Sequence, residues 1–498
     1  MANRGEIAVR VLRGAREAGL STVAVYSDAD AEAPHVAAAD RAIRIGPAAA
    51  SASYLNIPAL IEAARVTGAE AVHPGYGFLS ENPLLAEACE NAGLVFVGPP
   101  AEAIRAMGDK SEARRLAVQS GLPVIPGYDG EAQDLATLQR EAQQIGLPLL
   151  VKPSAGGGGK GMKRIEDARD LEEALASARR EAQAAFGDDR LILERYLSTI
   201  RHVEIQIFAD DHGQVVPLFE RECSVQRRHQ KIVEESPSMA LSDDLRAAMG
   251  NAAASLARTV GYRGAGTIEF VLDEAGRFYF LEMNTRLQVE HPVTELVTGL
   301  DLVHLQLSEA MGEPLPTRAL APSLRGHAIE CRIYAEDPGN GFLPSTGEVL
   351  TLVKPNGPGI RLDTGIETRS QVGLHYDPIL AKLIVYAETR AQAIARLRHA
   401  LTETVVLGVR TNLGFLRDVI DHPAFGRGET FTDFIPRHLA DWDGDAEVSP
   451  VELALAAFAS LGVGQRTSTV ETGHAGGGDP SSPWDRFREF RLSNGDAR

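Results

Sequence analysis

Residues 282–292 read EMNTRLQVEHP, and this run decides how the whole chain is interpreted. Every second residue from 282 to 290 is polar or charged, and most of the residues between them are apolar. Side chains alternate between faces in an extended chain, so we expect five polar residues to share one face: Glu282, Asn284, Arg286, Gln288 and Glu290. Carboxylate and amide oxygens are ligands that suit Mg²⁺, and a guanidinium beside a spare carboxylate suits an anion that must be held and deprotonated.

The residues just upstream predict a hairpin that adds a further ligand to this face. Residues 266–272 and 277–281 are typical of strands, and the segment 273–276 is typical of a turn between them. Glu269 would then lie across from Glu282 and supply a third oxygen for a metal. The alternative from pattern alone is an edge strand whose solvent face happens to be charged.

Composition bounds the class of protein. The chain has 498 residues, of which 44% are hydrophobic and 24% charged, enough for two to four domains with a substantial core. No apolar run approaches membrane-spanning length and none resembles a signal peptide before Asn3, so neither a membrane span nor a signal peptide is expected. The net charge of −18 argues against a nucleic-acid partner. The three cysteines lack metal-type spacing, which favours a reduced protein of the cytoplasm.

The first 107 residues alternate helical and strand patterns, which predicts a parallel sheet with flanking helices. Helices are expected at 4–18, 57–66 and 84–91, and strands at 22–26, 69–73 and 94–97. No G-x-G-x-x-G opens the first helix, so the pattern does not indicate a dinucleotide site.

A glycine-rich run, AGGGGKG at residues 155–161, lies between predicted strands at 147–152 and 162–165. A P-loop opens a helix and carries Ser or Thr where this chain has Gly161, so the run does not match a P-loop. A glycine hairpin can fold its backbone N–H groups over phosphates as a mobile lid. A flexible linker is the alternative, and the closely flanking strands disfavour it.

Three long motifs carry a resemblance to a known family. They are RECSVQRRHQK at 221–231, EMNTRLQVEHPVTE at 282–295 and ECRIYAEDP at 330–338. They closely resemble the biotin carboxylase branch of the ATP-grasp enzymes, over the chain from Asn3 to about Asp441. The resemblance implies an α/β fold (α+β overall) in four parts: a Rossmann-like pre-ATP-grasp domain at 1–107, an ATP-grasp domain at 108–322 with a lid at about 124–195, a biotin carboxylase C-terminal domain at 323–441, and a linker with the start of a further domain at 442–498.

The resemblance also implies the site residues. Those expected to bind ATP are Lys110, Lys152, Gly158, Gly159, Glu194, Leu197, His202 and His229. Those expected to hold Mg²⁺ or Mn²⁺ are Glu269, Glu282 and Asn284. Those expected to bind bicarbonate or biotin are Tyr76, Lys231, Arg286, Gln288, Val289, Glu290 and Arg332, with Arg286, Glu290, Lys231 and Arg332 as the catalytic set. Glu81 is expected near the biotin side of the cleft.

The implied activity is carboxylation of biotin by bicarbonate through carboxyphosphate, the first half-reaction of an acyl-CoA carboxylase. The Met-Lys-Met biotinylation motif is absent from this sequence, so biotin is expected on a carrier that belongs either to another chain or to a missing carboxy-terminal part. The segment 484–492 resembles the opening of the middle domain of acyl-CoA carboxylase alpha subunits, such as the methylcrotonyl-CoA type. The expected partners are the carrier and a carboxyltransferase beta subunit, with a dimer or larger homo-oligomer and with neither nucleic acid nor membrane.

Two other functions stay open at this point. One is another ATP-grasp carboxylate or amine ligase, which would share the ATP and metal residues but have no use for Arg332. The other is an inactive assembly subunit. Family members usually carry an apolar strand directly before ANRGEIA, and here the chain begins Met1-Ala2-Asn3, so the first sheet is expected to lack a central strand.

Overall fold

The computed structural model describes residues 1–155, 161–444, 450–451 and 454. Residues Met1–Gly444 form one compact unit, and Asp445–Arg498 form a second. Of the linker and further domain predicted at 442–498, residues 442–444 belong to the first unit, and Pro450, Val451 and Ala454 of the second unit are helical; the rest lies outside the described residues. Among the described residues, no helix is long and apolar enough to cross a membrane.

The N-terminal part alternates strands and helices as predicted, but its strands form two separate parallel pairs, β1 with β2 and β3 with β4. The backbone of Met1 and Ala2 lies between these pairs, because Val25 N donates to Met1 O (3.4 Å) and Ala2 N donates to His73 O (2.9 Å). The prediction of one parallel sheet is therefore corrected to two parallel pairs, and the gap between them agrees with the expectation that this sheet lacks a central strand. The elements are α1 (Gly5–Glu17), β1 (Val23–Ser27), α2 (Pro34–Ala38), β2 (Arg41–Gly46), α3 (Ile57–Thr67), β3 (Ala71–Val72), α4 (Pro83–Asn91), β4 (Val95–Phe96), α5 (Ala101–Gly108) and α6 (Lys110–Gln119).

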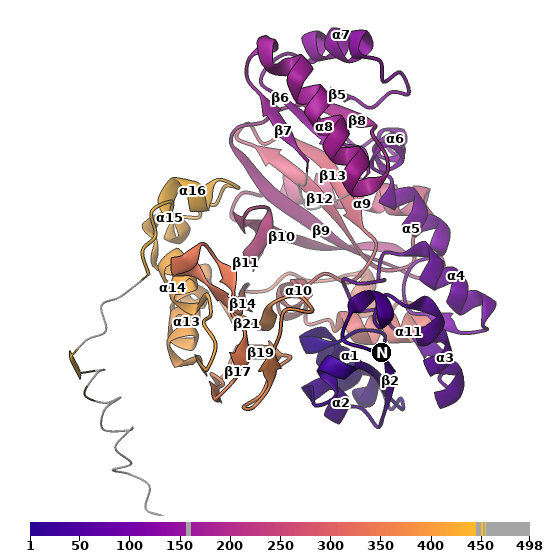
Figure 1. Ribbon diagram of the computed structural model, residues 1–498, viewed down its shortest axis with the longest axis vertical. Coiled ribbons are helices and arrows are strands. Elements are labelled where there is room, and N and C mark those ends of the chain that lie inside the picture. Colours follow the sequence, from indigo (N-terminus) through magenta and orange to yellow (C-terminus); the bar gives the residue numbers. More distant parts are fainter. Residues whose placement is uncertain (156–160, 445–449, 452–453, 455–498) are drawn as a thin grey trace, which may run out of the picture. The chain divides into compact units, whose positions relative to one another are not determined.

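The next segment folds as a small lid (Figure 1, top). Its antiparallel sheet has the order β5-β8-β6-β7, and α7 and α8 pack on it through Leu138 and Leu175. The glycine-rich run joins β6 to β7, so strands flank it on both sides as the sequence predicts. The elements are β5 (Gly127–Tyr128), α7 (Leu135–Ile145), β6 (Leu149–Pro153), β7 (Lys163–Ile165), α8 (Leu171–Phe186) and β8 (Leu191–Arg195).

A large antiparallel sheet carries the site, in the order β13-β12-β9-β10-β11-β14-β21-β19. It is continuous across the boundary predicted at residues 322–323, because β11 pairs with β14 from Val233↔Cys331 to Ser236↔Ala328. Its strands are β9 (Ile200–Ala209), β10 (Val215–Arg227), β11 (Gln230–Ser236), β12 (Gly264–Asp273), β13 (Phe278–Asn284), β14 (His327–Tyr334), β19 (Ile360–Thr364) and β21 (Ile379–Ala387).

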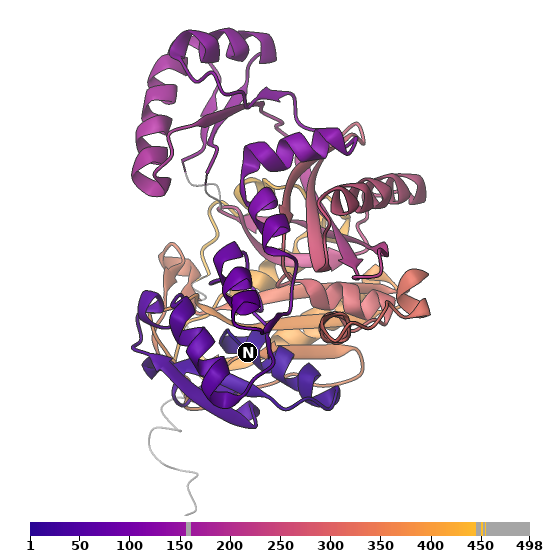
Figure 2. The ribbon, with the colours of Figure 1, turned by 90° about the vertical axis from the view of Figure 1, so that its right-hand side faces the viewer.

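The helices around this sheet, and the short strands beside it, complete the unit (Figures 1 and 2). The helices are α9 (Asp243–Thr259), α10 (His291–Thr298), α11 (Leu302–Ala310), α12 (Thr317–Leu320), α13 (Arg390–Glu403), α14 (Leu413–Asp421), α15 (Pro423–Gly426) and α16 (Phe434–His438). The short strands are β15 (Glu336–Asp337), β16 (Leu343–Pro344), β17 (Gly347–Glu348), β18 (Thr351–Val353), β20 (Gln371–Val372) and β22 (Val405–Leu407).

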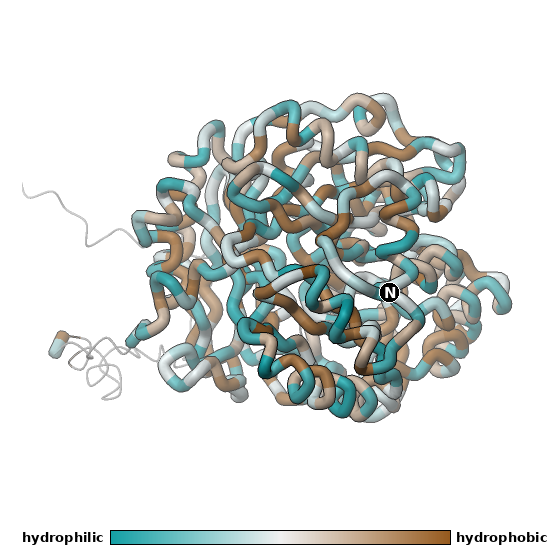
Figure 3. The backbone as a smooth tube through the Cα atoms, turned by 90° about the horizontal axis from the view of Figure 1, so that it is seen from above, coloured by the Kyte–Doolittle hydropathy of each residue, from teal (hydrophilic) through white to brown (hydrophobic). Residues whose placement is uncertain are grey.

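Near the cavity, strand alternation gives this sheet one apolar face and one face rich in polar residues, both buried. On β9, Val203, Ile205 and Ile207 pack in the core with α9, so His202, Glu204 and Gln206 face the other way. On β14, Ile329, Cys331 and Ile333 pack with α13 and α14, so Glu330 and Arg332 face α10. Hydrophobic and hydrophilic residues are accordingly interspersed along the backbone (Figure 3).

The run 282–290 is extended over only part of its length, which corrects the expectation of a single strand face. β13 ends at Asn284, the backbone bends through residues 285–290, and α10 begins at His291. The hairpin upstream is as predicted, with Glu269 paired across from Glu282. Alternation therefore orients the first two polar residues, and a bend orients the rest.

Candidate functional site

A cavity of about 800 Å³ lies where the lid, the polar face of the large sheet and the N-terminal loops meet. Its walls come from residues up to several hundred positions apart in the chain. The predicted site residues that line it are Tyr76, Lys110, Lys152, His202, His229, Lys231, Glu269, Glu282, Asn284, Arg286, Gln288, Val289 and Arg332. The fold thus brings most of the predicted set to one cavity.

Lys231 on β11 is the hub of the charged cluster in this cavity. Its Nζ lies 2.5 Å from Glu204 Oε2, 2.8 Å from Glu269 Oε1 and 2.7 Å from Glu290 Oε1. Burial opposes the ammonium charge, but the three carboxylates outweigh it and raise the pKa of Lys231 well above its usual value. Lys231 is therefore a fixed cation at neutral pH.

Glu290 lies directly behind the cavity wall and is fully buried. Its Oε1 accepts from Lys231, and its Oε2 accepts from an Arg332 guanidinium nitrogen at 2.9 Å. Burial works to raise the pKa of Glu290, yet Lys231, Arg332 and Arg221 outweigh burial and hold it well below the usual 4.5. Arg332 is also bound by Glu234, whose Oε1 accepts from Nε at 2.6 Å. The predicted catalytic base is thus ionised and held between two cations.

The residues predicted to hold a metal fit a divalent cation. Glu269 and Glu282 are paired residues on β12 and β13, and both carboxylates face the cavity. Burial and the neighbouring Glu269 carboxylate raise the pKa of Glu282. Two buried carboxylates side by side repel each other, and a bound cation would relieve that repulsion. Asn284 contacts Glu269 through its Nδ2 at 2.8 Å. Oxygen donors of this kind suit Mg²⁺.

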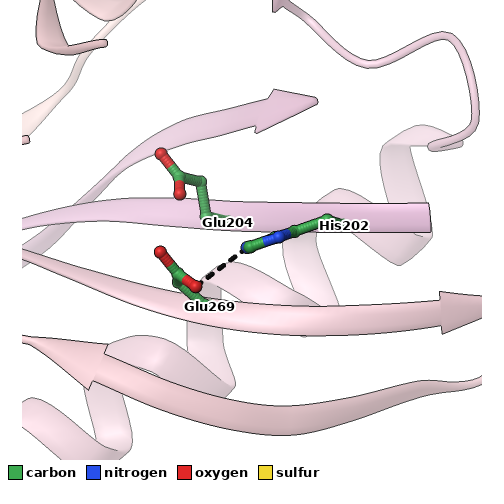
Figure 4. Close-up of side chains that lie close together, drawn as sticks. All are labelled: His202, Glu204 and Glu269. Carbon is green, nitrogen blue, oxygen red and sulfur yellow. Dashed lines mark ion pairs between the residues drawn. The ribbon is translucent and has the colours of Figure 1, made fainter. Parts of the chain in front are cut away.

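His202 and Glu204 extend the acidic cluster on the neighbouring strand (Figure 4). His202 Nε2 lies 2.9 Å from Glu269 Oε2, and these two residues with Glu204 form a group close enough to share one ion. Polar and apolar residues alternate from 202 to 207 in the sequence, which places His202, Glu204 and Gln206 on one face, but Glu204 is not among the predicted site residues. The contact from Lys231 to Glu204 was not predicted, although the alternation on β9 was a signal for it.

The residues predicted to bind ATP differ in their position relative to the cavity. Lys110, Lys152, His202 and His229 line the cavity, whereas Glu194 and Leu197 are not among its lining residues. Glu194 is buried and pairs with Lys152, so it reaches the site through that lysine. Gly158 and Gly159 lie outside the described residues.

The bend after β13 is held by Glu81, a residue of the N-terminal part of the protein. Glu81 accepts from Thr285 N at 3.1 Å and from Arg286 Nε at 2.9 Å. Arg286 in turn donates to Gln288 Oε1 at 2.9 Å and to Asn284 Oδ1 at 3.0 Å. These contacts join Asn284, one of the predicted metal ligands, to the predicted anion site in one hydrogen-bonded group.

The class of protein follows from this geometry. A small antiparallel lid with a glycine-rich loop, set over a carboxylate-lined cleft on a large sheet, defines an ATP-grasp ligase. Three family models match the chain: "Biotin carboxylase, N-terminal domain" over residues 1–104, "Carbamoyl-phosphate synthase L chain, ATP binding domain" over 109–318, and "Biotin carboxylase C-terminal domain" over 330–437.

Curated relatives and solved structures agree with these matches. The methylcrotonoyl-CoA carboxylase alpha subunit of Dictyostelium discoideum is 48% identical, over 99% of this chain and 70% of its own length. That of Arabidopsis thaliana is 50% identical, over 89% and 61%. The Haemophilus influenzae biotin carboxylase is 49% identical, over 88% of this chain and 98% of its own. The chain thus spans about 60–70% of the length of these two alpha subunits.

Among solved structures, a Campylobacter jejuni biotin carboxylase in complex with an ATP ligand has a TM-score of 0.85 and 44% identity, covering 88% of this chain and 98% of its own. The biotin carboxylase domain dimer of Hydrogenobacter thermophilus 2-oxoglutarate carboxylase, solved with MgADP and bicarbonate, has a TM-score of 0.84 and 42% identity, covering 88% and 96%. The chain belongs to the biotin carboxylase family, whose members are ATP-dependent ligases.

Proposed function

We propose that this cleft activates bicarbonate with ATP and passes the resulting CO₂ to N1′ of a carrier-bound biotin. The observation that supports this most is the contact of Glu290 with both Lys231 and Arg332. Lys231 links Glu290 to the acidic pair that would hold the metal, and Arg332 opens onto the same cavity from β14. The Glu290 carboxylate therefore connects the site proposed for phosphoryl transfer to a second site, where Arg332 supplies a cation for the biotin acceptor.

The ATP half of the site consists of cations and oxygen ligands. We assign Lys110, Lys152 and His229 to the nucleotide, with His202, Glu194 and Leu197 beside it and Gly158 and Gly159 on the lid. Glu269, Glu282 and Asn284 would hold Mg²⁺ or Mn²⁺, which would offset charge on the phosphates when bound. Closure of the lid would exclude water from a reactive anhydride.

The bicarbonate half uses the bend after β13. Arg286, Gln288 and the Val289 N–H would orient bicarbonate beside Lys231, and Glu290 would take its proton. A bicarbonate oxygen bonds to the γ-phosphorus, the bond to the β–γ bridging oxygen breaks, and ADP leaves. The carboxyphosphate then splits into CO₂ and phosphate, and the phosphate takes the N1′ proton so that N1′ bonds to CO₂. Arg332 would stabilise the ureido oxygen as it becomes negative, with Tyr76 beside the biotin ring.

The longer assembly is proposed from the relatives. The alpha subunits matched here belong by name to methylcrotonoyl-CoA carboxylases, and the Hydrogenobacter domain is a dimer. We infer that this chain acts in an acyl-CoA carboxylase with a biotin carrier and a carboxyltransferase, as a homo-oligomer. The cytoplasmic location stays a prediction, since several relatives are mitochondrial by name.

The test is ADP release from MgATP, with and without bicarbonate and free biotin. We expect release that requires bicarbonate and rises when biotin is added, because biotin consumes the CO₂ formed from carboxyphosphate while phosphate takes the N1′ proton and leaves. Release indifferent to bicarbonate would indicate a different ligase, and the absence of release would favour an assembly subunit.

A strained turn beside the nucleotide side supports a further prediction. Arg228 and His229 join β10 to β11 with φ of 50° and 67°, a two-residue turn that usually contains Asn-Gly. Holding a non-glycine residue there costs about 1 kcal/mol or more. His229→Gly should raise the free energy of unfolding by about 1 kcal/mol and raise KM for MgATP several-fold. Denaturant unfolding and steady-state kinetics measure both.

Arg369 provides the matched control for this turn. Its φ is 78°, it is exposed, and it is not among the residues lining the cavity. Arg369→Gly should give a similar gain in stability and leave KM for MgATP unchanged. An equal rise in KM in both variants would mean that His229 has no particular role in nucleotide binding.

A further inference from the structure

Lys382 on β21 stands behind the wall of the cavity. It is completely buried and is not among the lining residues, yet its Nζ donates to the Val289 carbonyl oxygen at 2.8 Å. The same nitrogen lies 3.3 Å from Glu6 Oε2 on α1 and 5.9 Å from the centre of the Tyr76 ring. One buried ammonium therefore contacts the bend that carries the anion site, the N-terminal helix and the predicted biotin-side tyrosine.

The sheet register explains why the lysine points there. Lys382 pairs with Arg332 on β14, so both side chains lie on the face that packs against α10, while Leu383 enters the apolar core on the opposite face. Lys382 and Arg332 thus approach the bend from adjacent strands. Arg332 contacts the Glu290 carboxylate, and Lys382 contacts the backbone one residue earlier.

Val289 is fixed at both of its peptide planes. The Gln288 carbonyl accepts from His291 Nδ1 at 2.8 Å, and the Val289 carbonyl accepts from Lys382. In a planar trans peptide the C=O and the following N–H point in opposite directions. His291 therefore sets the direction of the Val289 N–H, and Lys382 sets that of the next plane, which leads to Glu290. Both side chains are fully buried, so water does not compete for these contacts.

We propose that Lys382 is a positioning residue for bicarbonate, acting through the Val289 carbonyl to hold the Val289 N–H and the Glu290 backbone in their binding geometry. This inference rests on the proposed function, in which Val289 and Glu290 contact bicarbonate. A simpler role would be to neutralise Glu6. Lys382 Nζ lies closer to the Val289 carbonyl, at 2.8 Å, than to Glu6 Oε2, at 3.3 Å, so the carbonyl is its nearer partner.

The test is the steady-state kinetics of Lys382→Met, with bicarbonate and MgATP varied in turn. Loss of a buried charged hydrogen bond is expected to raise KM for bicarbonate by roughly ten- to a hundredfold, with KM for MgATP changed by less than about twofold. A purely structural role would lower the amount of folded enzyme, and hence kcat, without this separation between the two substrates.

Two further variants keep the test decisive. Glu6→Gln combined with Lys382→Met removes the carboxylate that the single variant leaves unpaired, so the fold is retained while the bicarbonate defect should persist. Asp363→Asn is the matched control: Asp363 is buried opposite Lys382 on β19 and pairs with Arg361, so it should affect stability and not KM for bicarbonate. The inference would be overturned if the double variant folded and had the same KM for bicarbonate as the unmodified protein. Failure of the unmodified protein to need bicarbonate at all would instead overturn the proposed function on which it rests.

Discussion

Glu290→Gln is expected to lower bicarbonate-dependent ADP release by about a thousandfold, within the range of roughly 10²–10⁴ typical of a general base. The substitution keeps the shape of a fully buried side chain but removes the group that accepts the proton. The amide also presents a donor where Lys231 and Arg332 already donate. Binding of MgATP should persist, because Glu290 is not assigned to the nucleotide.

The matched control is Glu220→Gln on β10. Glu220 is also fully buried and bound by an arginine, Arg246, at 2.8 Å, but its partners are Arg246 and Ser238, whereas Glu290 is bound by Lys231 and Arg332 from the cavity wall. The Glu220→Gln variant should be less stable than the unmodified protein, with little change in ADP release per folded molecule. Equal losses of activity in the two variants would show that disruption of a buried ion pair, and not loss of the base, explains the Glu290 result.

Lys231→Met is expected to lower the free energy of unfolding by about 3–5 kcal/mol at pH 7, because removing one partner of a buried ion cluster leaves charge uncompensated. Lys231 Nζ lies within 2.8 Å of a carboxylate oxygen on each of Glu204, Glu269 and Glu290. Activity should fall as well, since the cation assigned to bicarbonate is removed. Lys163→Met, which breaks a half-exposed pair with Glu181, should cost no more than about 1 kcal/mol.

The stability loss should depend on pH in a defined direction. Against the effect of burial, Lys231 helps to depress the pKa of Glu269 and Glu290 below the ordinary 4.5, so its stabilisation is present above that value and is lost as pH falls through the folded-state pKa values. The difference between the unmodified protein and Lys231→Met should therefore be largest near neutral pH and shrink below about pH 4.5. Denaturant unfolding at several pH values measures it. A difference that does not change between pH 7 and pH 4 would contradict the uncompensated-charge account.

The sequence predicted the hairpin, the lid strands beside the glycine-rich run, and the charged and polar residues of the cavity from Lys231 to Arg332, because these depend on local pattern or on long motifs. Glu269 and Glu282 face each other because two strands with a tight turn fix their register. The extended reading of residues 282–290 failed at Asn284, because the bend is held by Glu81, about 200 residues earlier in the chain. A local pattern has no access to such a partner.

The contacts behind the cavity wall were likewise beyond sequence reasoning. Lys382 reaches Val289 only because β21 pairs with β14 in one particular register. Arg221 is fully buried and donates to Glu204 Oε1 at 2.5 Å, although a basic residue in a charged run is usually solvated. These roles arise from pairing between strands that are far apart in the chain, and local sequence patterns do not reveal which strands pair.

The most direct test of the central claim follows an oxygen atom. With bicarbonate labelled with ¹⁸O, the account predicts that the phosphate released with ADP carries one oxygen from bicarbonate, because that oxygen bonds to the γ-phosphorus before CO₂ departs. Phosphate whose new oxygen comes only from water would contradict the account, since it would mean that the cleft hydrolyses ATP without activating bicarbonate.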